Sequence, residues 1–126
     1  MDHKTEPELP LEGVRVLIAE DEFLIAGPIE EALREAGADT SHAATVRAAL
    51  LDIDYALPSV ALLDVRLGLQ TSEEVADSLA AHHVPFVFYS GADLPEELRG
   101  KHPDAEVLHK PVAPRTIVDT VVKIAR

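Results

Sequence analysis

Five residues that could do chemistry stand where short apolar runs of this chain end. In chain order they are Glu20, Asp21, Asp64, Ser90 and Lys110. Carboxylates that are crowded together repel one another, and proton uptake or a bound cation must relieve that repulsion. An all-oxygen cluster, in a chain with no cysteine, suits Mg²⁺. A carboxylate nucleophile with a metal ion, a lysine and a hydroxyl could then stabilise a phosphoryl group during its transfer.

The stretch that ends in Asp64 is the most informative one. Residues 60–63 form a short apolar run in a stretch bounded by Pro58 and Gly68, which predicts a strand buried on both faces of a parallel sheet. In open α/β sheets, ligands bind at the carboxyl ends of the strands. Asp64 is therefore expected at a binding edge, although this stretch alone fits equally well a carboxylate that caps a loop.

Five strand-like runs alternate with five helical patterns along the chain. This alternation, without an internal repeat, predicts an α/β fold with a parallel sheet covered by helices on both faces. The expected architecture is a flavodoxin-like doubly wound five-stranded sheet in the order 2-1-3-4-5, which brings the strand ends with the five residues to one crevice. The strands are predicted at 14–19, 38–43, 59–64, 85–89 and 106–109, and the helices at 23–36, 46–54, 71–82, 94–99 and 114–126.

Two residues give local signals in the first two helices. Pro28 falls inside the helical periodicity of 23–36, where proline removes one hydrogen bond and crowds the preceding turn. Either a late helix start or a kink is expected there. Thr45 precedes the second helix and is expected to cap it.

Composition limits the classes of protein and of partner. A length of 126 residues is typical of one domain, with 1–12 predicted as a flexible lead and 13–126 as the folded part. The net charge of −12 is the reverse of the basic footprint of nucleic-acid binders, so direct binding of nucleic acid is not expected. The charged start of the chain and the lack of a long apolar run predict a soluble, cytoplasmic protein without a membrane partner.

Three short motifs connect these residues to a known family. They are Val16-Leu17-Ile18-Ala19-Glu20-Asp21-Glu22, Leu62-Leu63-Asp64 and Lys110-Pro111, with Ser90-Gly91 between the last two. In order and spacing they resemble the acidic pair, phosphoacceptor and lysine motifs of the receiver domain of bacterial two-component response regulators. The resemblance covers 13–126. The segment 86–92 also resembles a subgroup of single-domain receivers that carries a Phe-Ala-Thr-Gly-Tyr-like motif.

The resemblance implies a signalling role in a phosphorelay. Asp64 would accept phosphate from a sensor histidine kinase or a phosphotransfer protein, and Lys110 would pair with the phosphoryl group. Mg²⁺ would be bound by Asp21, Asp64 and the main-chain carbonyl of Arg66, with Glu20 acting mainly through a bound water. Catalysis would be limited to Mg²⁺-dependent self-phosphorylation and self-dephosphorylation, and the output would be a surface for a downstream protein target.

The switch region departs from the family pattern. The resemblance implies that Ser90 hydrogen-bonds a phosphoryl oxygen and carries the switch, but Ser90 before a glycine also fits plain turn chemistry. Val107 stands where many receivers have an aromatic switch residue, which leaves a coupled serine–aromatic movement open. Tyr89, Ser90 and Ala92 also differ from the subgroup motif. The helical pattern before Gly100 is short and polar, so 94–102 is expected to be mobile and to order on phosphorylation.

Two other functions stay open from the sequence. A pseudo-receiver would keep the fold and bind partners without phosphate; the departures from the family pattern allow it, and the intact acidic and lysine motifs argue against it. A Mg²⁺-dependent phosphatase with an aspartate nucleophile would need a second aspartate two residues beyond Asp64, where this chain has Arg66. Whether the chain is a whole single-domain protein or an excised domain is also left open.

Overall fold

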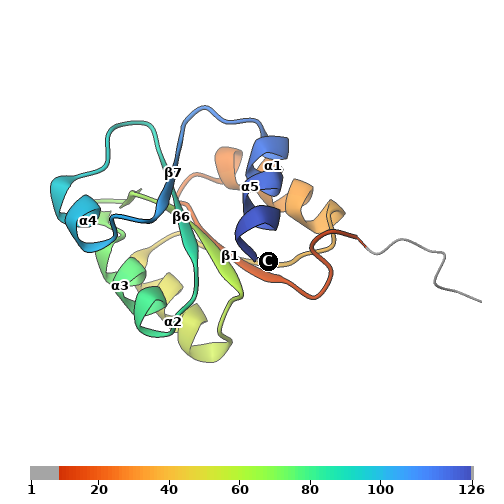
Figure 1. The fold of residues 1–126 in the computed structure, drawn as a ribbon, viewed down its shortest axis with the longest axis horizontal. Coiled ribbons are helices and arrows are strands. Elements are labelled where there is room, and N and C mark those ends of the chain that lie inside the picture. Colours follow the sequence, from red (N-terminus) through yellow and green to blue (C-terminus); the bar gives the residue numbers. More distant parts are fainter. Residues whose placement is uncertain (1–8, 126) are drawn as a thin grey trace, which may run out of the picture.

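A parallel sheet of five strands runs through the middle of the structure (Figure 1). The computed structural model describes residues 9–125 of the chain. The sheet order is β2-β1-β3-β6-β7, which confirms the flavodoxin-like order 2-1-3-4-5 counted over the strands of this sheet. The strands are β1 (Arg15–Ala19), β2 (Asp39–Ala43), β3 (Val60–Asp64), β6 (Phe86–Ser90) and β7 (Glu106–His109).

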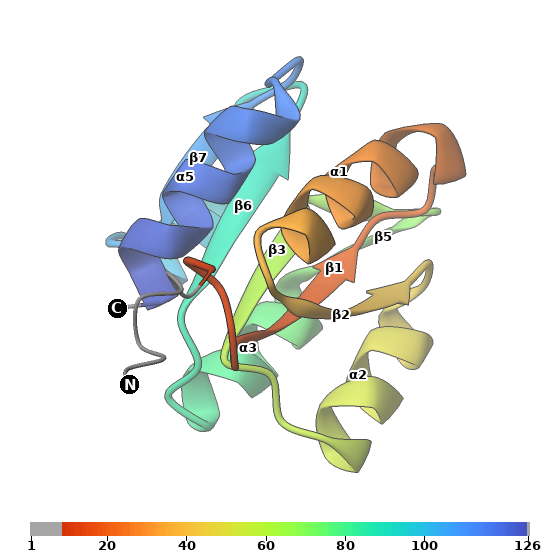
Figure 2. The same cartoon turned by 90° about the vertical axis from the view of Figure 1, so that its right-hand side faces the viewer.

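Within residues 9–125, five helices surround the sheet. Helices α1 and α5 pack side by side on one face, and α2 and α3 pack on the other (Figure 2). Their bounds are α1 (Phe23–Glu35), α2 (Val46–Tyr55), α3 (Glu73–Ala81), α4 (Glu96–Lys101) and α5 (Pro114–Ala125). Within residues 9–125, no helix has the length and apolar character needed to cross a membrane.

Strand β3 is buried on both faces, as its apolar run predicts. All five of its residues are buried. Successive side chains of a strand point to opposite faces of the sheet, and a hydrophobic core covers each face here. Ala61 and Leu63 belong to the core beneath α2 and α3, whereas Val60 and Leu62 belong to the core beneath α1 and α5. Each buried leucine contributes about 2 kcal/mol of hydrophobic stabilisation. The two cores fix the carboxyl end of β3 in the middle of the sheet.

Helix α1 contains Pro28 and nevertheless begins at Phe23. The alternative of a late helix start is therefore wrong. Burial of Ile29 and Leu33 against the sheet holds this segment helical, although a proline inside a helix removes one backbone hydrogen bond.

The second helix begins where its capping residue predicts. The Oγ1 atom of Thr45 accepts a hydrogen bond from the backbone N–H of Ala48 at 3.0 Å. This bond satisfies one of the amide groups that the first turn of a helix leaves without a partner. Thr45 therefore caps α2, as expected.

A two-stranded hairpin follows β3 and was not predicted. Strands β4 (Arg66–Leu67) and β5 (Gln70–Thr71) pair antiparallel across a two-residue loop. Gly68, the first loop residue, has a φ of +66°, a left-handed conformation that glycine adopts without steric cost. The hairpin begins two residues after Asp64, so it lies beside the predicted site.

The first described residues pack onto the folded body. Residues 1–8 of the predicted lead 1–12 lie outside the described part of the chain. Leu11 is fully buried, and its N–H donates to the carbonyl oxygen of Ala36 at 2.8 Å. The packed body therefore includes Leu11.

Candidate functional site

The ends of β1 and β3 bring three carboxylates together. One oxygen from each of Glu20, Asp21 and Asp64 lies within 4.8 Å of the other two. The strands are adjacent and pair Ala19 with Leu63, so the residues that follow them emerge at the same edge of the sheet. Glu20 and Asp64 are buried, whereas Asp21 is exposed. The three acids thus meet at the predicted edge.

Lys110 reaches this cluster from the end of β7, the edge strand that lies two strands from β3. Its Nζ lies 2.9 Å from Asp64 Oδ2 and 3.2 Å from Glu20 Oε1. Burial alone would lower the pKa of Lys110, but the hydrogen bond and charge of Asp64, together with Glu20, outweigh burial and raise that pKa. Lys110 is therefore a cation that neutralises part of the carboxylate charge.

Glu20 is the most perturbed acid of the cluster. Burial, and next the negative charge of Asp64, raise the pKa of Glu20 to about 7. A hydrogen bond from the N–H of Glu22 to Glu20 Oε2 at 3.1 Å, and the ammonium of Lys110, act in the opposite direction. The charge of one lysine does not fully balance the negative charge of the three carboxylates. Near neutral pH, the cluster can therefore take up a proton or a further cation.

The loop and hairpin after β3 donate main-chain hydrogen bonds to two of the acids. The N–H of Arg66 donates to Asp64 Oδ1 at 3.2 Å, and the N–H of Gly68 donates to Asp21 Oδ2 at 2.9 Å. The sequence predicted the carbonyl of Arg66 as a metal ligand, but it predicted neither the hydrogen bond from the Arg66 amide nor a role for Gly68. A glycine four positions after the central acid was the available signal, because it permits the tight loop that turns this amide inward.

Ser90 lies at the end of β6, but its hydroxyl is engaged in its own turn. The Oγ atom donates to the carbonyl oxygen of Ala92 at 2.7 Å and accepts from the N–H of Ala92 at 3.1 Å. Among residues 9–125, the structure records no hydrogen bond between Ser90 and the acidic cluster. Ser90 therefore makes the turn contacts that its position before a glycine allows.

Tyr89 contacts the site, and sequence reasoning noted it only as a departure from a motif. The Nζ of Lys110 lies 4.9 Å from the centroid of the Tyr89 ring. The ring is buried among apolar side chains beneath α1 and α5, and this burial raises the pKa of its hydroxyl. An aromatic residue one position before Ser90 was the only signal in the sequence.

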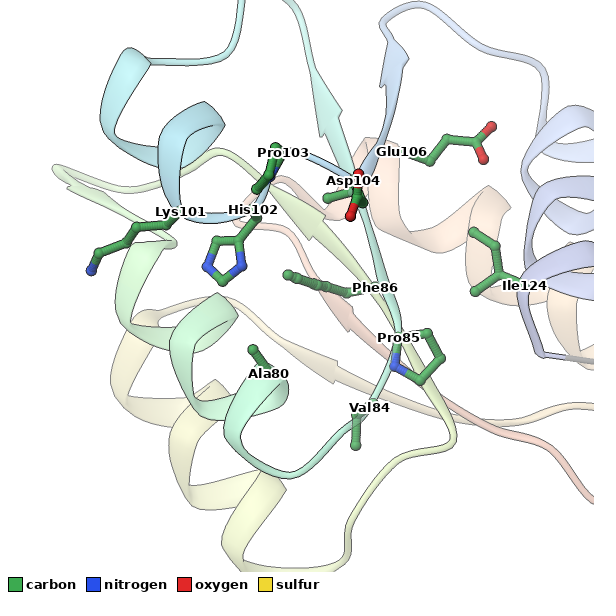
Figure 3. Close-up of a pocket in the computed structure, with 11 residues that line it drawn as sticks. Ala80, Val84, Pro85, Phe86, Lys101, His102, Pro103, Asp104, Glu106 and Ile124 are labelled. Carbon is green, nitrogen blue, oxygen red and sulfur yellow. The ribbon is translucent and has the colours of Figure 1, made fainter.

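A separate hollow of about 420 Å³ lies at the other end of the strands (Figure 3). Its lining includes Phe86 and Glu106, which begin β6 and β7, together with His102 and Ile124. The acidic cluster lies at the carboxyl ends of the strands instead, so this hollow is not part of it.

Comparison with known proteins finds similar solved structures but no match by sequence to a family model or a curated protein. The chemotaxis protein CheY4 of Vibrio cholerae is 26% identical, with a TM-score of 0.77 over 88% of this chain and 98% of that chain. The PhyR response regulator REC domain of Erythrobacter litoralis is 25% identical, with a TM-score of 0.76 over 90% of each chain.

A further solved structure agrees in fold. The CheY-like response regulator receiver domain protein of Methanospirillum hungatei is 22% identical, with a TM-score of 0.80 over 89% of this chain and 93% of that chain. All three neighbours match most of this chain. The two that are 26% and 25% identical support a receiver role in response regulation, and the third shows the fold. The chain therefore has the fold of the CheY-like receiver domains of response regulators.

Proposed function

We propose that this chain accepts a phosphoryl group on Asp64 from a sensor histidine kinase or a phosphotransfer protein, and signals through contacts with a downstream protein. The observation that carries the proposal is the position of Lys110, whose ammonium bridges Glu20 and Asp64 at 3.2 Å and 2.9 Å. A lysine held against a carboxylate beside two further acids is suited to stabilise a phosphoryl group in transfer.

The acidic cluster fits Mg²⁺ by the chemistry of its donors. Three carboxylates, each with an oxygen within 4.8 Å of the others, offer the hard oxygen ligands that this ion prefers. Asp21, Asp64 and the main-chain carbonyl of Arg66 would hold the ion, and Glu20 would act through a bound water. When bound, Mg²⁺ supplies positive charge that offsets the charge of the phosphoryl oxygens.

In the proposed transfer, an oxygen of Asp64 is the nucleophile. A bond forms between this oxygen and phosphorus as the bond from phosphorus to the donor imidazole nitrogen breaks, and the nitrogen keeps the electron pair. The ammonium of Lys110, which contacts the carboxylate of Asp64 before the transfer, would then contact an oxygen of the new phosphoryl group. The N–H of Arg66, which donates to Asp64 Oδ1, helps to orient the carboxylate before the transfer.

Ser90 would carry the response to phosphorylation. In the unmodified protein its Oγ donates to the carbonyl oxygen of Ala92. To bond a phosphoryl oxygen, the hydroxyl must leave this turn, and the segment after β6 must rearrange with it. The changed surface would then select the downstream target.

Intact mass measured after incubation with acetyl phosphate and Mg²⁺ tests the proposal. We expect the wild-type protein to gain one phosphoryl group, and Asp64→Asn or a chelated sample to gain none. Asp93→Asn is the matched control, because it removes an exposed carboxylate from the loop after β6, outside the cluster. This control should gain the group as the wild type does.

If acetyl phosphate adds no phosphoryl group to the wild type, two further reagents decide the question: phosphoramidate, a second donor, and beryllofluoride, which mimics a bound phosphoryl group. If phosphoramidate also fails, and beryllofluoride with Mg²⁺ leaves the amide signal of Ser90 unchanged, then phosphoryl acceptance is wrong. The pseudo-receiver alternative would then be favoured, with partner binding unchanged in Asp64→Asn.

A further inference from the structure

The strand that carries Tyr89 separates Lys110 from its carboxylate partners. In the sheet, β6 lies between β3, which ends in Asp64, and β7, which precedes Lys110. The lysine side chain must therefore cross the end of β6 to place its Nζ 2.9 Å from Asp64 Oδ2. Tyr89 lies on this path, with its ring centroid 4.9 Å from the same Nζ.

The face of the Tyr89 ring attracts the ammonium group directly. A cation within about 6 Å of a ring centroid is held by the negative face of the aromatic system. The ring is itself fixed, because Tyr89 is 5% exposed and packs in the core beneath α1 and α5. The ring is thus a rigid platform under a flexible side chain.

Lys110 needs such a platform because its other partners change during the reaction. Its ammonium has three N–H donors, and the recorded carboxylate contacts are to Glu20 and Asp64. Once a phosphoryl group is attached to Asp64, at least one of these contacts must give way. Attraction to a ring face does not depend on the direction of one N–H bond, so the lysine can exchange partners while it stays over the ring.

We propose that Tyr89 is a positioning residue that holds the Lys110 ammonium over the end of β6 for phosphoryl transfer to Asp64. The inference rests on the proposed function for its effect on rate, whereas the contact between ring and ammonium exists in the unmodified protein. A leucine at this position would fill part of the core without holding a cation. A phenylalanine would keep the ring face and lose only the hydroxyl group.

The test compares Tyr89→Phe and Tyr89→Leu with the matched control Phe88→Leu. Phe88 is the preceding residue of β6, fully buried in the opposite core beneath α2 and α3. Its replacement by leucine weakens the same strand without removing an aromatic ring near Lys110. Thermal unfolding first shows that each variant is folded.

The first readout is the proton resonance of the Lys110 ε-methylene group, which an aromatic ring face shifts upfield. We expect the shift in the wild type, in Tyr89→Phe and in Phe88→Leu, and its loss in Tyr89→Leu. The second readout is the rate of phosphorylation by acetyl phosphate. Tyr89→Leu should be on the order of tenfold slower than the wild type, and Tyr89→Phe should retain most of the rate.

The two readouts separate the two proposals. If the wild type takes up no phosphoryl group from acetyl phosphate or phosphoramidate and does not respond to beryllofluoride, the proposed function fails. The resonance of Lys110 still decides whether Tyr89 holds the ammonium. An unshifted Lys110 resonance in the wild type overturns the inference. Equal rates in the wild type and Tyr89→Leu, or equal slowing in Tyr89→Leu and Phe88→Leu, also overturn it.

Discussion

The Nζ of Lys110 lies 2.9 Å from Asp64 Oδ2, although 46 positions of the chain separate the two residues. The strands that lead to them are not neighbours, because β6 lies between β3 and β7. The contact therefore depends on three strands that end at the same level. It places the positive charge where a phosphoryl group on Asp64 would carry its negative charge.

Lys110→Ala should destabilise the metal-free protein and slow phosphoryl uptake. The substitution leaves Asp64 and Glu20 buried without their cation, which we expect to lower the free energy of unfolding by about 1–3 kcal/mol at pH near 8. The rate of uptake should fall about a hundredfold, as when a group that stabilises transition-state charge is removed. Urea unfolding in the presence of chelator and intact mass against time measure the two effects. An unchanged rate of phosphoryl uptake would show that Lys110 takes no part in the reaction.

Glu20→Gln should stabilise the metal-free protein more as the pH rises. The pKa of Glu20 is about 7 in the folded protein against an ordinary value of 4.5, so the folded state binds the proton more tightly than the unfolded state. Ionisation of Glu20 therefore reduces stability progressively between these two values and fully above the higher one. The advantage of the variant should grow from near zero at about pH 4 to about 3 kcal/mol at about pH 8.

Thermal and urea unfolding with chelator, at several pH values, check this prediction. Glu31→Gln is the control, because Glu31 is exposed on α1 and outside the cluster. Its difference from the wild type should show no such rise with pH. A pH-independent difference for Glu20→Gln would contradict burial as the cause of the raised pKa.

Gly68→Ala should weaken Mg²⁺ binding through the hairpin. An added Cβ at Gly68 meets no atom within 4 Å, so the expected effect comes from the φ of +66° alone. A left-handed conformation at alanine costs about 1–2 kcal/mol. Relaxation of this strain would move the N–H that donates to Asp21 at 2.9 Å. Calorimetric titration with Mg²⁺ and urea unfolding measure the loss.

The matched control for this substitution is Gly100→Ala. Gly100 lies in α4, and a Cβ there also meets nothing within 4 Å. Because alanine favours helix, Gly100→Ala should be neutral or stabilising by about 0.5–1 kcal/mol, with unchanged Mg²⁺ affinity. Equal loss in the two variants would exclude the hairpin amide as the cause.

Asp77→Asn should speed amide exchange in 94–102. Asp77 connects α3 to the end of α4, since its carboxylate accepts from Lys101 Nζ at 2.9 Å and from His102 Nε2 at 3.1 Å. The hydrogen bond from Lys101 is the main cause of the lowered pKa of Asp77. The stabilisation is therefore present above the ordinary aspartate value of 3.8 and is lost as the pH falls through the lowered pKa.

Hydrogen exchange in the wild type, in this variant and in the exposed control Asp104→Asn checks the prediction. In the unmodified wild type we expect 94–102 to exchange faster than the neighbouring strands and to gain protection on phosphorylation. High protection of this segment before phosphorylation would contradict the expected mobility.

Residue types and their spacing were enough to predict the fold. The apolar run before Asp64 and the alternation of strand and helix patterns depend on local periodicity and on burial, which a sequence displays directly. The order of the sheet followed, because few topologies satisfy right-handed crossovers with five strands. The meeting of the acids with Lys110 followed in turn, since the carboxyl ends of parallel strands share one edge.

The contacts within the site were decided only by the tertiary structure. Whether the hydroxyl of Ser90 faces Ala92 or the carboxylates is a choice between side-chain positions, and its residue type does not determine that choice. The amide of Gly68 reaches Asp21 through a hairpin whose register depends on a single turn. Tyr89 contacts Lys110 because β6 lies between β3 and β7, and the lysine side chain crosses the end of β6 to reach Asp64. Distances between groups far apart in the chain depend on packing, and a local pattern does not contain them.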